Sequence, residues 1–243
     1  MKISELFYSL QGEGKRTGYP SFFIRTNFCN LRCKFSGGNL CDTAYTSWFP
    51  EKEDNKEDIS VQEIINEYSK YKNSDVVITG GEPALQSTEL YELCSDLKSG
   101  FKNIFITLET NGTIYGKFAK NINLASISPK LKSSVPLDTK YEQFHSLKRI
   151  NEESLRKFQK DSENGIYDIQ WKFVITEEKD IEEILELQQL IGFRNKDIFL
   201  MSEGITKEQL NKKRKMVSEL CKKHQMNYTD RLQIILWGNK RRT

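Results

Sequence analysis

The segment Asp75-Val76-Val77-Ile78-Thr79-Gly80-Gly81-Glu82-Pro83 joins a strand to the start of a helix. The β-branched residues within 75–79 favour a strand. Gly80 and Gly81 lack side chains, so a ligand can approach the backbone closely where the strand ends. The helix that follows has four apolar side chains on one face: Leu90, Leu93, Cys94 and Leu97. A strand–helix unit of this kind favours an α/β fold.

The same strand–helix order recurs along the chain. Further strands are expected at residues 22–26, 104–108, 124–128, 171–175, 198–200 and 232–237. Helices are expected after the capping box Ser60–Glu63 and near residues 181–191 and 206–224. This order implies a parallel sheet with helices outside. The number of strands favours a partial or modified TIM-type (β/α)6 barrel over a small open sheet.

Several residues capable of chemistry directly follow these strands. In barrels of this type the reactive groups gather at the C-terminal ends of the strands. The residues in that position are Cys29, Gly80, Asn111 and Lys130. We therefore expect one rim of the sheet to carry the functional site.

A single domain is expected over residues 1–243, because the chain shows neither an internal repeat nor a linker. Two polar segments, 44–59 and 131–168, are expected to be insert loops. The second is expected to contain one helix around Glu152–Lys160.

The composition restricts the class of protein. With 37 basic and 34 acidic residues the net charge is +3, which is too balanced for bulk binding of nucleic acid, so no direct nucleic-acid partner is expected. The basic clusters 212–215 and 240–242 fit a solvated helix face and a charged tail. No apolar run is long enough to span a membrane, and the N-terminus lacks the apolar segment of a signal peptide. A cytoplasmic protein without a membrane partner is expected.

Three cysteines lie in the run Cys29-Asn-Leu-Arg-Cys33-Lys-Phe-Ser-Gly-Gly-Asn-Leu-Cys41-Asp-Thr43. Three thiolates can hold three irons of a [4Fe-4S] cluster and leave the fourth iron open to chelate a small molecule. Structural zinc is the alternative, but a closed zinc site needs a fourth ligand. The remaining candidates are distant in sequence or on apolar helix faces: His145, His224, Cys94 and Cys221.

The cysteine run and the Gly-Gly-Glu-Pro motif together resemble the radical S-adenosylmethionine superfamily. The usual spacing there is Cys-x3-Cys-x2-Cys, and this chain keeps the first interval. Seven residues separate Cys33 from Cys41, so the extra residues, including Ser36-Gly37-Gly38, are expected to bulge out.

Within that superfamily the chain resembles the 7-carboxy-7-deazaguanine synthase family over most of its length. The matching segments are Phe7–Gly14, Arg25, Cys41–Thr43, Thr79–Pro83, Glu109–Gly112, Ser128–Lys130, Lys172–Val174, Leu200–Gly204 and Arg231–Lys240. One branch of the family commonly has His where this chain has Gln233, so a substrate contact at that position is left open.

The resemblance implies three groups of ligands. Substrate-binding residues are expected to be Leu10, Gln11, Gly12, Glu13, Arg25 and Thr79. Residues that bind S-adenosylmethionine are expected to be Leu40, Cys41, Asp42, Gly80, Gly81, Glu82, Ser128, Lys130, Met201, Ser202, Glu203 and Gly204. The cluster ligands are expected to be Cys29, Cys33 and Cys41, with Thr43 on magnesium.

The residue types suit these roles. Arg25 is planar and bidentate, as recognition of a carboxylate requires. Gln11 and Glu13 offer the donors and acceptors that a pterin edge needs, and Thr43 offers the hard oxygen that magnesium prefers. Each also has a plainer interpretation: Arg25 as a strand-edge charge, Gln11 and Glu13 as a polar turn, and Thr43 as a turn residue. Thr79 could simply favour a strand, and Lys130 could be a solvated charge.

The resemblance also implies an activity. The cluster, reduced by a donor such as flavodoxin, would cleave S-adenosylmethionine, and the radical formed would convert 6-carboxy-5,6,7,8-tetrahydropterin into 7-carboxy-7-deazaguanine with loss of ammonia. This is a carbon–nitrogen lyase reaction of queuosine biosynthesis, assisted by magnesium in a homodimeric family. A glycyl-radical-enzyme activase and a non-catalytic iron–sulfur or zinc module are the alternatives.

Overall fold

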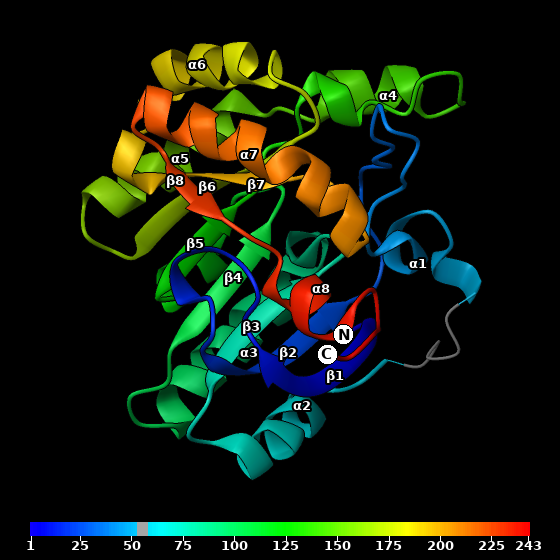
Figure 1. The fold of residues 1–243 in the computed structure, drawn as a ribbon. Helices are drawn as coiled ribbons and strands as arrows, with labels where there is room; N and C mark the ends of the chain where they lie inside the picture. Colours follow the sequence, from blue (N-terminus) through cyan, green and yellow to red (C-terminus); the bar gives the residue numbers. More distant parts are fainter. Residues whose placement is uncertain (53–57) are drawn as a thin grey trace.

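The computed structural model describes residues 1–52 and 58–243, and its centre is one sheet of eight strands in sequence order (Figure 1). The strands are β1 (Ile3–Leu10), β2 (Pro20–Thr26), β3 (Asp75–Gly80), β4 (Ile106–Thr110), β5 (Leu124–Ile127), β6 (Asp168–Ile175), β7 (Ile198–Ser202) and β8 (Asn227–Thr229). Strand β1 is antiparallel to β2, and every later neighbour pair is parallel.

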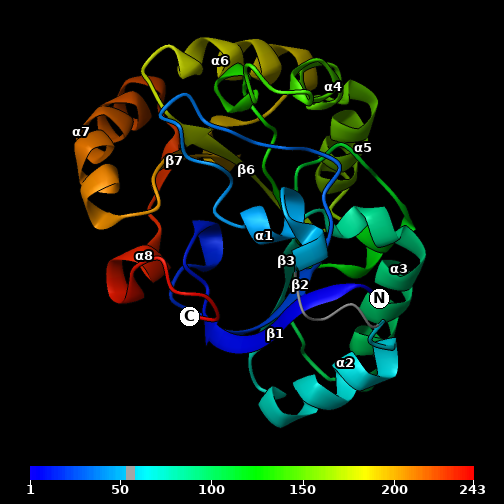
Figure 2. The same cartoon turned by 90° about the vertical axis from the view of Figure 1, so that its right-hand side faces the viewer.

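The helices are α1 (Ala44–Ser47), α2 (Val61–Tyr68), α3 (Ser87–Gly100), α4 (Glu142–Lys148), α5 (Glu152–Glu163), α6 (Asp180–Ile191), α7 (Lys207–His224) and α8 (Leu232–Trp237). Helices α2, α3, α5, α6 and α7 surround the curved sheet on its outer side, whereas α1 lies in the middle of this ring (Figure 2). Within the described residues β1 and β8 do not pair, so the barrel stays open. The prediction of a partial barrel is confirmed, with seven parallel strands, β2–β8, and the antiparallel β1 at one edge.

Local sequence signals account for the helices that were expected. At the start of α2, the Ser60 backbone N–H donates to Glu63 Oε2 at 2.8 Å, and Glu63 N–H donates back to Ser60 Oγ at 3.2 Å. This is the reciprocal capping box, which satisfies two of the helix's otherwise unpaired donors. Helix α7 begins after Thr206, whose side chain accepts from the Gln209 N–H.

Residues 232–237 form α8, so the prediction of a final strand there is wrong. A short apolar run does not distinguish a strand from a helix by periodicity. The place beside β7 is taken by the preceding residues 227–229. Only Ile234 of α8 is buried, and the helix ends at Gly238, whose φ of +72° is favourable for glycine.

The two segments expected to be insert loops contain helices. Residues 44–52 form α1 and a 3₁₀ turn at Pro50–Lys52, and residues 53–57 lie outside the described part. In 131–168 the expected helix is α5, which lies between β5 and β6 as a crossover helix does in a parallel sheet. Helix α4 was not expected, because its apolar residues Phe144 and Leu147 are exposed and give no buried stripe.

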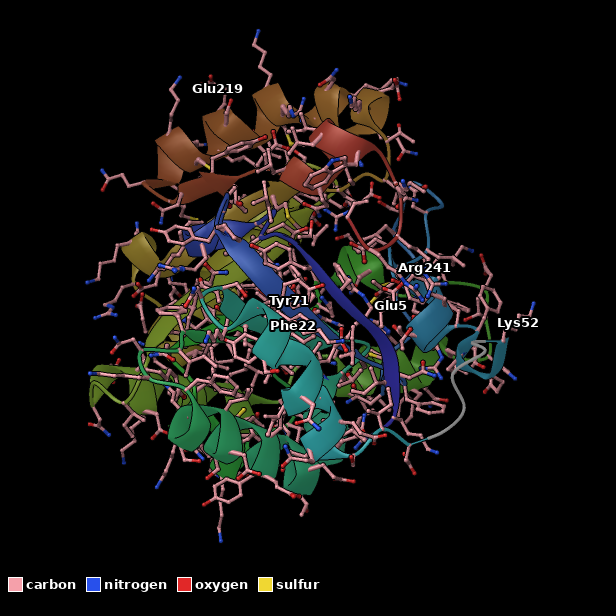
Figure 3. All side chains as sticks on the ribbon, turned by 90° about the horizontal axis from the view of Figure 1, so that it is seen from below. Glu5, Phe22, Lys52, Tyr71, Glu219 and Arg241 are labelled. Carbon is pink, nitrogen blue, oxygen red and sulfur yellow. The ribbon has the colours of Figure 1, made fainter. Side chains whose placement is uncertain are left out.

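The alternation of side chains along each strand separates the core from the opposite face of the sheet. In β6, the residues at odd positions belong to the core beneath the helices: Ile169, Trp171, Phe173 and Ile175. Lys172 and Val174 point to the other face, where they line a cavity. The same applies to β2, where Phe22 packs in the core against Tyr71, with ring centroids 5.5 Å apart (Figure 3).

Replacing Leu93 by alanine tests how α3 packs on the sheet. Leu93 is fully buried in the core. Leu93→Ala removes apolar contacts and leaves a cavity, so the free energy of unfolding should fall by about 2–5 kcal/mol. Urea unfolding followed by circular dichroism measures the change. The control is Glu92→Ala on the exposed face of the same helix, which should change it by less than about 0.5 kcal/mol. Equal losses in both variants would contradict the packing.

Candidate active site

A cavity of about 200 Å³ opens at the C-terminal ends of the strands. Every strand from β1 to β7 contributes to its lining, as do the loop that carries the three cysteines, helix α8 and the segments on either side of it. The site therefore lies on the rim where the sequence placed it.

The three clustered cysteines line this cavity, and none of them is in a disulfide. Burial, together with Glu82, raises the pKa of Cys29 to about 12. Burial also raises the pKa of Cys41, as does Asp42 beside it. Thiolates in this environment need a cationic partner, and metal binding supplies one.

The cysteines do not converge on a single ion. Within residues 1–52 and 58–243, no three His, Cys, Asp or Glu side chains form a group that could hold one metal ion. A tetrahedral zinc site requires such convergent ligands, whereas each thiolate of a cubane binds its own iron. The three thiols lining one cavity therefore fit an iron–sulfur cluster better than structural zinc.

The residues between Cys33 and Cys41 form a small hairpin. Lys34 and Leu40 form an antiparallel bridge, and Phe35 N–H donates to Asn39 O at 2.8 Å. At the base of the hairpin, Cys41 N–H donates to Cys33 O at 3.1 Å. The extra residues thus bulge out as expected, and the chain returns so that the two cysteines are backbone neighbours.

The loop that carries the three cysteines is held on both sides. Lys34 N–H donates to Ser134 O at 3.0 Å, and Asn39 Nδ2 donates to Glu203 Oε1 at 2.8 Å. On the side of the first two cysteines, the Arg32 N–H donates to Nδ1 of the buried His145 at 3.2 Å. His145 is carried by α4, so this unexpected helix positions the loop.

Gly80 and Gly81 are required by a close approach of two backbone segments. A Cβ on Gly80 would lie 2.3 Å from Thr26 O, and one on Gly81 would lie 2.0 Å from Phe28 O. In this arrangement Gly81 N–H donates to Thr26 O at 3.1 Å. The end of β3 therefore lies directly against the segment that leads into Cys29.

Glu82 is fully buried behind this contact and does not line the cavity. Its carboxylate accepts from Thr110 Oγ1 at 2.7 Å, Asn111 N–H at 2.7 Å and Ala84 N–H at 3.0 Å. Burial raises the pKa of Glu82 above its usual value despite these bonds. Glu82 therefore connects the end of β3 to the end of β4 through hydrogen bonds.

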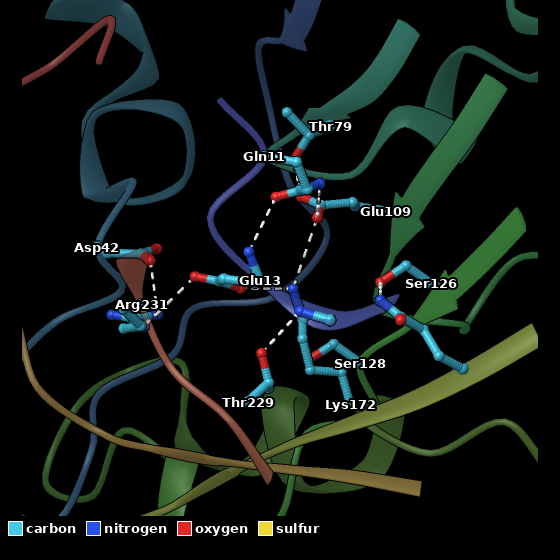
Figure 4. Close-up of polar contacts among 12 residues, drawn as sticks. Gln11, Glu13, Asp42, Thr79, Glu109, Ser126, Ser128, Lys172, Thr229 and Arg231 are labelled. Carbon is cyan, nitrogen blue, oxygen red and sulfur yellow. Dashed lines mark hydrogen bonds and ion pairs between the residues drawn. The ribbon is translucent and has the colours of Figure 1, made fainter. Parts of the chain in front are cut away.

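A network of charged side chains lines the same cavity (Figure 4). Lys172 Nζ donates to Glu13 Oε2 at 2.5 Å and lies 3.6 Å from Glu109 Oε1. Burial alone lowers the pKa of Lys172, yet Glu109 and Glu13 raise it above its ordinary value, so Lys172 stays charged. Burial raises the pKa of Glu13, but Lys172 and Arg231 outweigh it and keep Glu13 ionised.

Polar side chains on neighbouring strands fix this network. Gln11 Nε2 donates to Glu109 Oε1 at 3.2 Å, and Thr79 Oγ1 donates to Glu109 Oε2 at 2.8 Å. Gln233 Nε2 donates to Glu13 Oε1 at 2.9 Å. The glutamine at the position where one branch of the family has His therefore contacts a candidate substrate-binding residue. On the side nearer the cysteines, Arg231 Nη2 donates to Asp42 Oδ2 at 2.7 Å.

Most of the sequence-derived candidates share this cavity: Leu10, Gln11, Gly12, Glu13, Arg25, Cys29, Cys33, Cys41, Asp42, Thr43, Thr79, Gly80, Gly81, Ser128, Lys130 and Met201. Five do not line it: Leu40, Glu82, Ser202, Glu203 and Gly204. Sequence reasoning named Lys172 and Arg231 only within matching segments and gave them no role. A lone charge inside the apolar strand 171–175 was the available signal for Lys172.

The chain is similar to known proteins over nearly its whole length. The sequence model of the Radical SAM superfamily matches residues 23–187. A 7-carboxy-7-deazaguanine synthase of Halobacterium salinarum is 40% identical over 98% of this chain and 91% of that protein. One of Rhodopirellula baltica is 34% identical over 99% of this chain and 88% of its own length.

Solved structures agree on the fold. The crystal structure of QueE from Escherichia coli superposes with a TM-score of 0.62 at 24% identity, covering 95% of this chain and 93% of that one. The structure of anSMEcpe with bound AdoMet and a peptide superposes with a TM-score of 0.52 at 17% identity. This match covers 89% of this chain and 66% of that one. Among the described residues, no helix has the length and apolar character to cross a membrane. The chain belongs to the radical S-adenosylmethionine superfamily and, within it, to the 7-carboxy-7-deazaguanine synthase family.

Proposed function

We propose that this protein converts 6-carboxy-5,6,7,8-tetrahydropterin into 7-carboxy-7-deazaguanine with loss of ammonia, as a lyase of queuosine and related 7-deazapurine biosynthesis. The observation that carries the proposal is that one cavity is lined by the three cysteines, by Arg25 and by the Glu13–Lys172–Glu109 network. The relatives' names favour this activity over the glycyl-radical activase.

The cysteine side of the cavity is the proposed cofactor side. When bound there, a [4Fe-4S] cluster with S-adenosylmethionine supplies the radical that abstracts hydrogen from the substrate. Cys29, Cys33 and Cys41 would hold the cluster. The residues that would contact S-adenosylmethionine are those of the candidate set that line the cavity: Cys41, Asp42, Gly80, Gly81, Ser128, Lys130 and Met201.

Thr43 is the proposed magnesium ligand. It lines the cavity, and its hydroxyl lies 3.3 Å from Cys41 Sγ. Magnesium takes few protein ligands and completes its shell with water and substrate oxygens, which fits a single hydroxyl at this place.

The remaining side is proposed to bind the pterin. Arg25 offers a guanidinium to the substrate carboxylate. Gln11 is oriented by Glu109 and by the Glu13 N–H, which donates to Gln11 Oε1 at 3.2 Å. Because Glu13 is ionised, it can accept hydrogen bonds from the donors of the pterin ring. Lys172 balances the two carboxylates and keeps both in place.

We extend the proposal to the partners and setting of the enzyme. A [4Fe-4S] cluster must be reduced by one electron before it can act, and flavodoxin is the proposed electron donor. The exposed apolar residues Leu236 and Trp237 of α8 suit a homodimer interface. The balanced charge favours neither nucleic acid nor a membrane surface as partner, and a single-domain cytoplasmic enzyme is proposed.

The decisive experiment is anaerobic turnover. The protein is reconstituted with iron and sulfide, then given dithionite, S-adenosylmethionine, magnesium and 6-carboxytetrahydropterin, and the products are followed by mass spectrometry. We expect 7-carboxy-7-deazaguanine together with cofactor turnover. Formation of 5′-deoxyadenosine without that product would support cleavage of S-adenosylmethionine and refute the assignment of the pterin as substrate.

Removing one cysteine tests the cluster ligands. Cys41→Ala should lose most of the iron and sulfide found in the wild type, which should carry about four irons per chain after reconstitution. The matched control is Cys94→Ala, because Cys94 is fully buried in α3, away from the cavity. Wild-type iron content in Cys41→Ala would exclude Cys41 as a ligand.

Replacing Arg25 tests recognition of the carboxylate. Truncating one partner of a buried charged pair costs several kcal/mol, so Arg25→Ala should lower kcat/KM by about 100-fold or more. Its iron content should stay at the wild-type value. The control is Arg16→Ala, because Arg16 is paired with Asp75 at the opposite end of β3. Turnover of Arg25→Ala at the wild-type rate would refute the assignment.

A further inference from the structure

Glu5, on β1, is a buried carboxylate that no role above uses. Its side chain is 0% exposed, yet three separate segments donate to it. Arg25 Nε from β2 lies 2.9 Å from Oε2, and the Tyr45 hydroxyl from α1 lies 3.0 Å from the same oxygen. Arg241 Nε, beyond α8, lies 2.8 Å from Oε1 (Figure 3).

The strand register places Glu5 opposite Arg25. The two residues are cross-strand partners in the β1–β2 pair, where side chains directly opposite each other interact. Between Ile3 and Glu5 the register shifts, and an irregularity of this kind re-aims the side chains that follow it. The contact is therefore built into the backbone pairing.

A buried carboxylate is costly unless charged groups and hydrogen bonds compensate for the lost water. Burial raises the pKa of Glu5, but Arg241, Arg25 and Tyr45 together hold it below its usual value, so Glu5 is ionised. The Arg241 guanidinium also lies 3.8 Å over the Tyr45 ring. The two residues that support Glu5 thus also support each other.

Glu5 occupies only one edge of the Arg25 guanidinium. Its contact is with Nε, and within the described part of the chain no hydrogen bond engages the two terminal nitrogens. The Phe7 ring centroid lies 5.5 Å from Arg25 Cζ, and Arg25 lines the cavity. The free edge has the fork geometry that binds a carboxylate through two parallel hydrogen bonds.

We propose that Glu5 is a positioning residue for substrate specificity: it holds Arg25 by Nε so that the free edge of the guanidinium meets the carboxylate of the pterin. Tyr45 and Arg241 hold Glu5 in place. This inference rests on the proposed function, because the ligand it selects is the carboxylated pterin. An ordinary structural ion pair would instead affect every ligand of the cavity alike.

The test compares two ligands on the reconstituted enzyme with S-adenosylmethionine present. Equilibrium dialysis measures the affinity for 6-carboxypterin and for pterin without the carboxylate. Glu5→Gln keeps the shape of the side chain and removes its charge. We expect its affinity for 6-carboxypterin to fall about tenfold, in line with loss of a charged hydrogen bond, and its affinity for plain pterin to change less than about twofold.

Tyr45→Phe provides a second variant, which removes one hydrogen bond to Oε2 and keeps the ring under Arg241. It should lower the affinity for 6-carboxypterin by about threefold and leave that for plain pterin unchanged. If Glu5→Gln does not fold, Tyr45→Phe alone tests the role of Glu5. In turnover, both variants should raise KM and leave kcat within about twofold. The control is Asp75→Asn, which breaks the ion pair with Arg16 at the far end of β3 and should bind both ligands as the wild type does.

Equal weakening of both ligands in the folded variants, or unchanged affinity for 6-carboxypterin, would overturn the role of Glu5. The proposed function fails separately. A wild type that binds 6-carboxypterin selectively, loses that selectivity in Glu5→Gln, and yet forms no 7-carboxy-7-deazaguanine would refute the activity and support the positioning role. If the wild type forms 7-carboxy-7-deazaguanine but both variants keep its selectivity for 6-carboxypterin, the activity is supported and the positioning role of Glu5 is refuted.

Discussion

The contact between the end of β3 and the chain leading into Cys29 determines how the rest of the site is arranged. Gly81 N–H bonds to Thr26 O, and a side chain on Gly81 would collide with Phe28 O. This contact holds the segment that leads into Cys29 against the end of β3. Glu82, the next residue, ties the same point to β4 through Thr110 and Asn111. One backbone approach therefore aligns the loop that carries the cysteines with two strand ends.

The sheet supplies a second constraint, because its side chains alternate between two environments. Trp171 and Phe173 pack beneath the helices, while Lys172 between them reaches the cavity. An open barrel leaves room on its inner face for charged groups that pair with one another. Such groups are stable there only because each has a partner of opposite charge, as Lys172 has in Glu13.

Much of this arrangement could be predicted from the sequence. Period-two runs and the Ser60 capping box located strands and helices, because local chemistry determines those elements. The residues 232–237 could not be assigned in this way, since their conformation depends on β8 already occupying the edge beside β7. The place of Glu5 depends on strand register, and that of Glu203 on a contact with Asn39 across the fold. Such long-range contacts leave no local signal.

Because of the hairpin between Cys33 and Cys41, the number of residues between these cysteines does not indicate how far apart they lie in space. A motif counts residues along the chain, but a cluster responds to where the sulfur atoms lie. Because the hairpin closes at its base through the Cys41 N–H and Cys33 O, its length is decoupled from the separation of the two thiols. Its tip, Ser36-Gly37-Gly38, is exposed. Residues can be added to or removed from such a loop without changing the backbone contact between the two cysteines, so searches that require one fixed interval will miss chains that retain the same geometry.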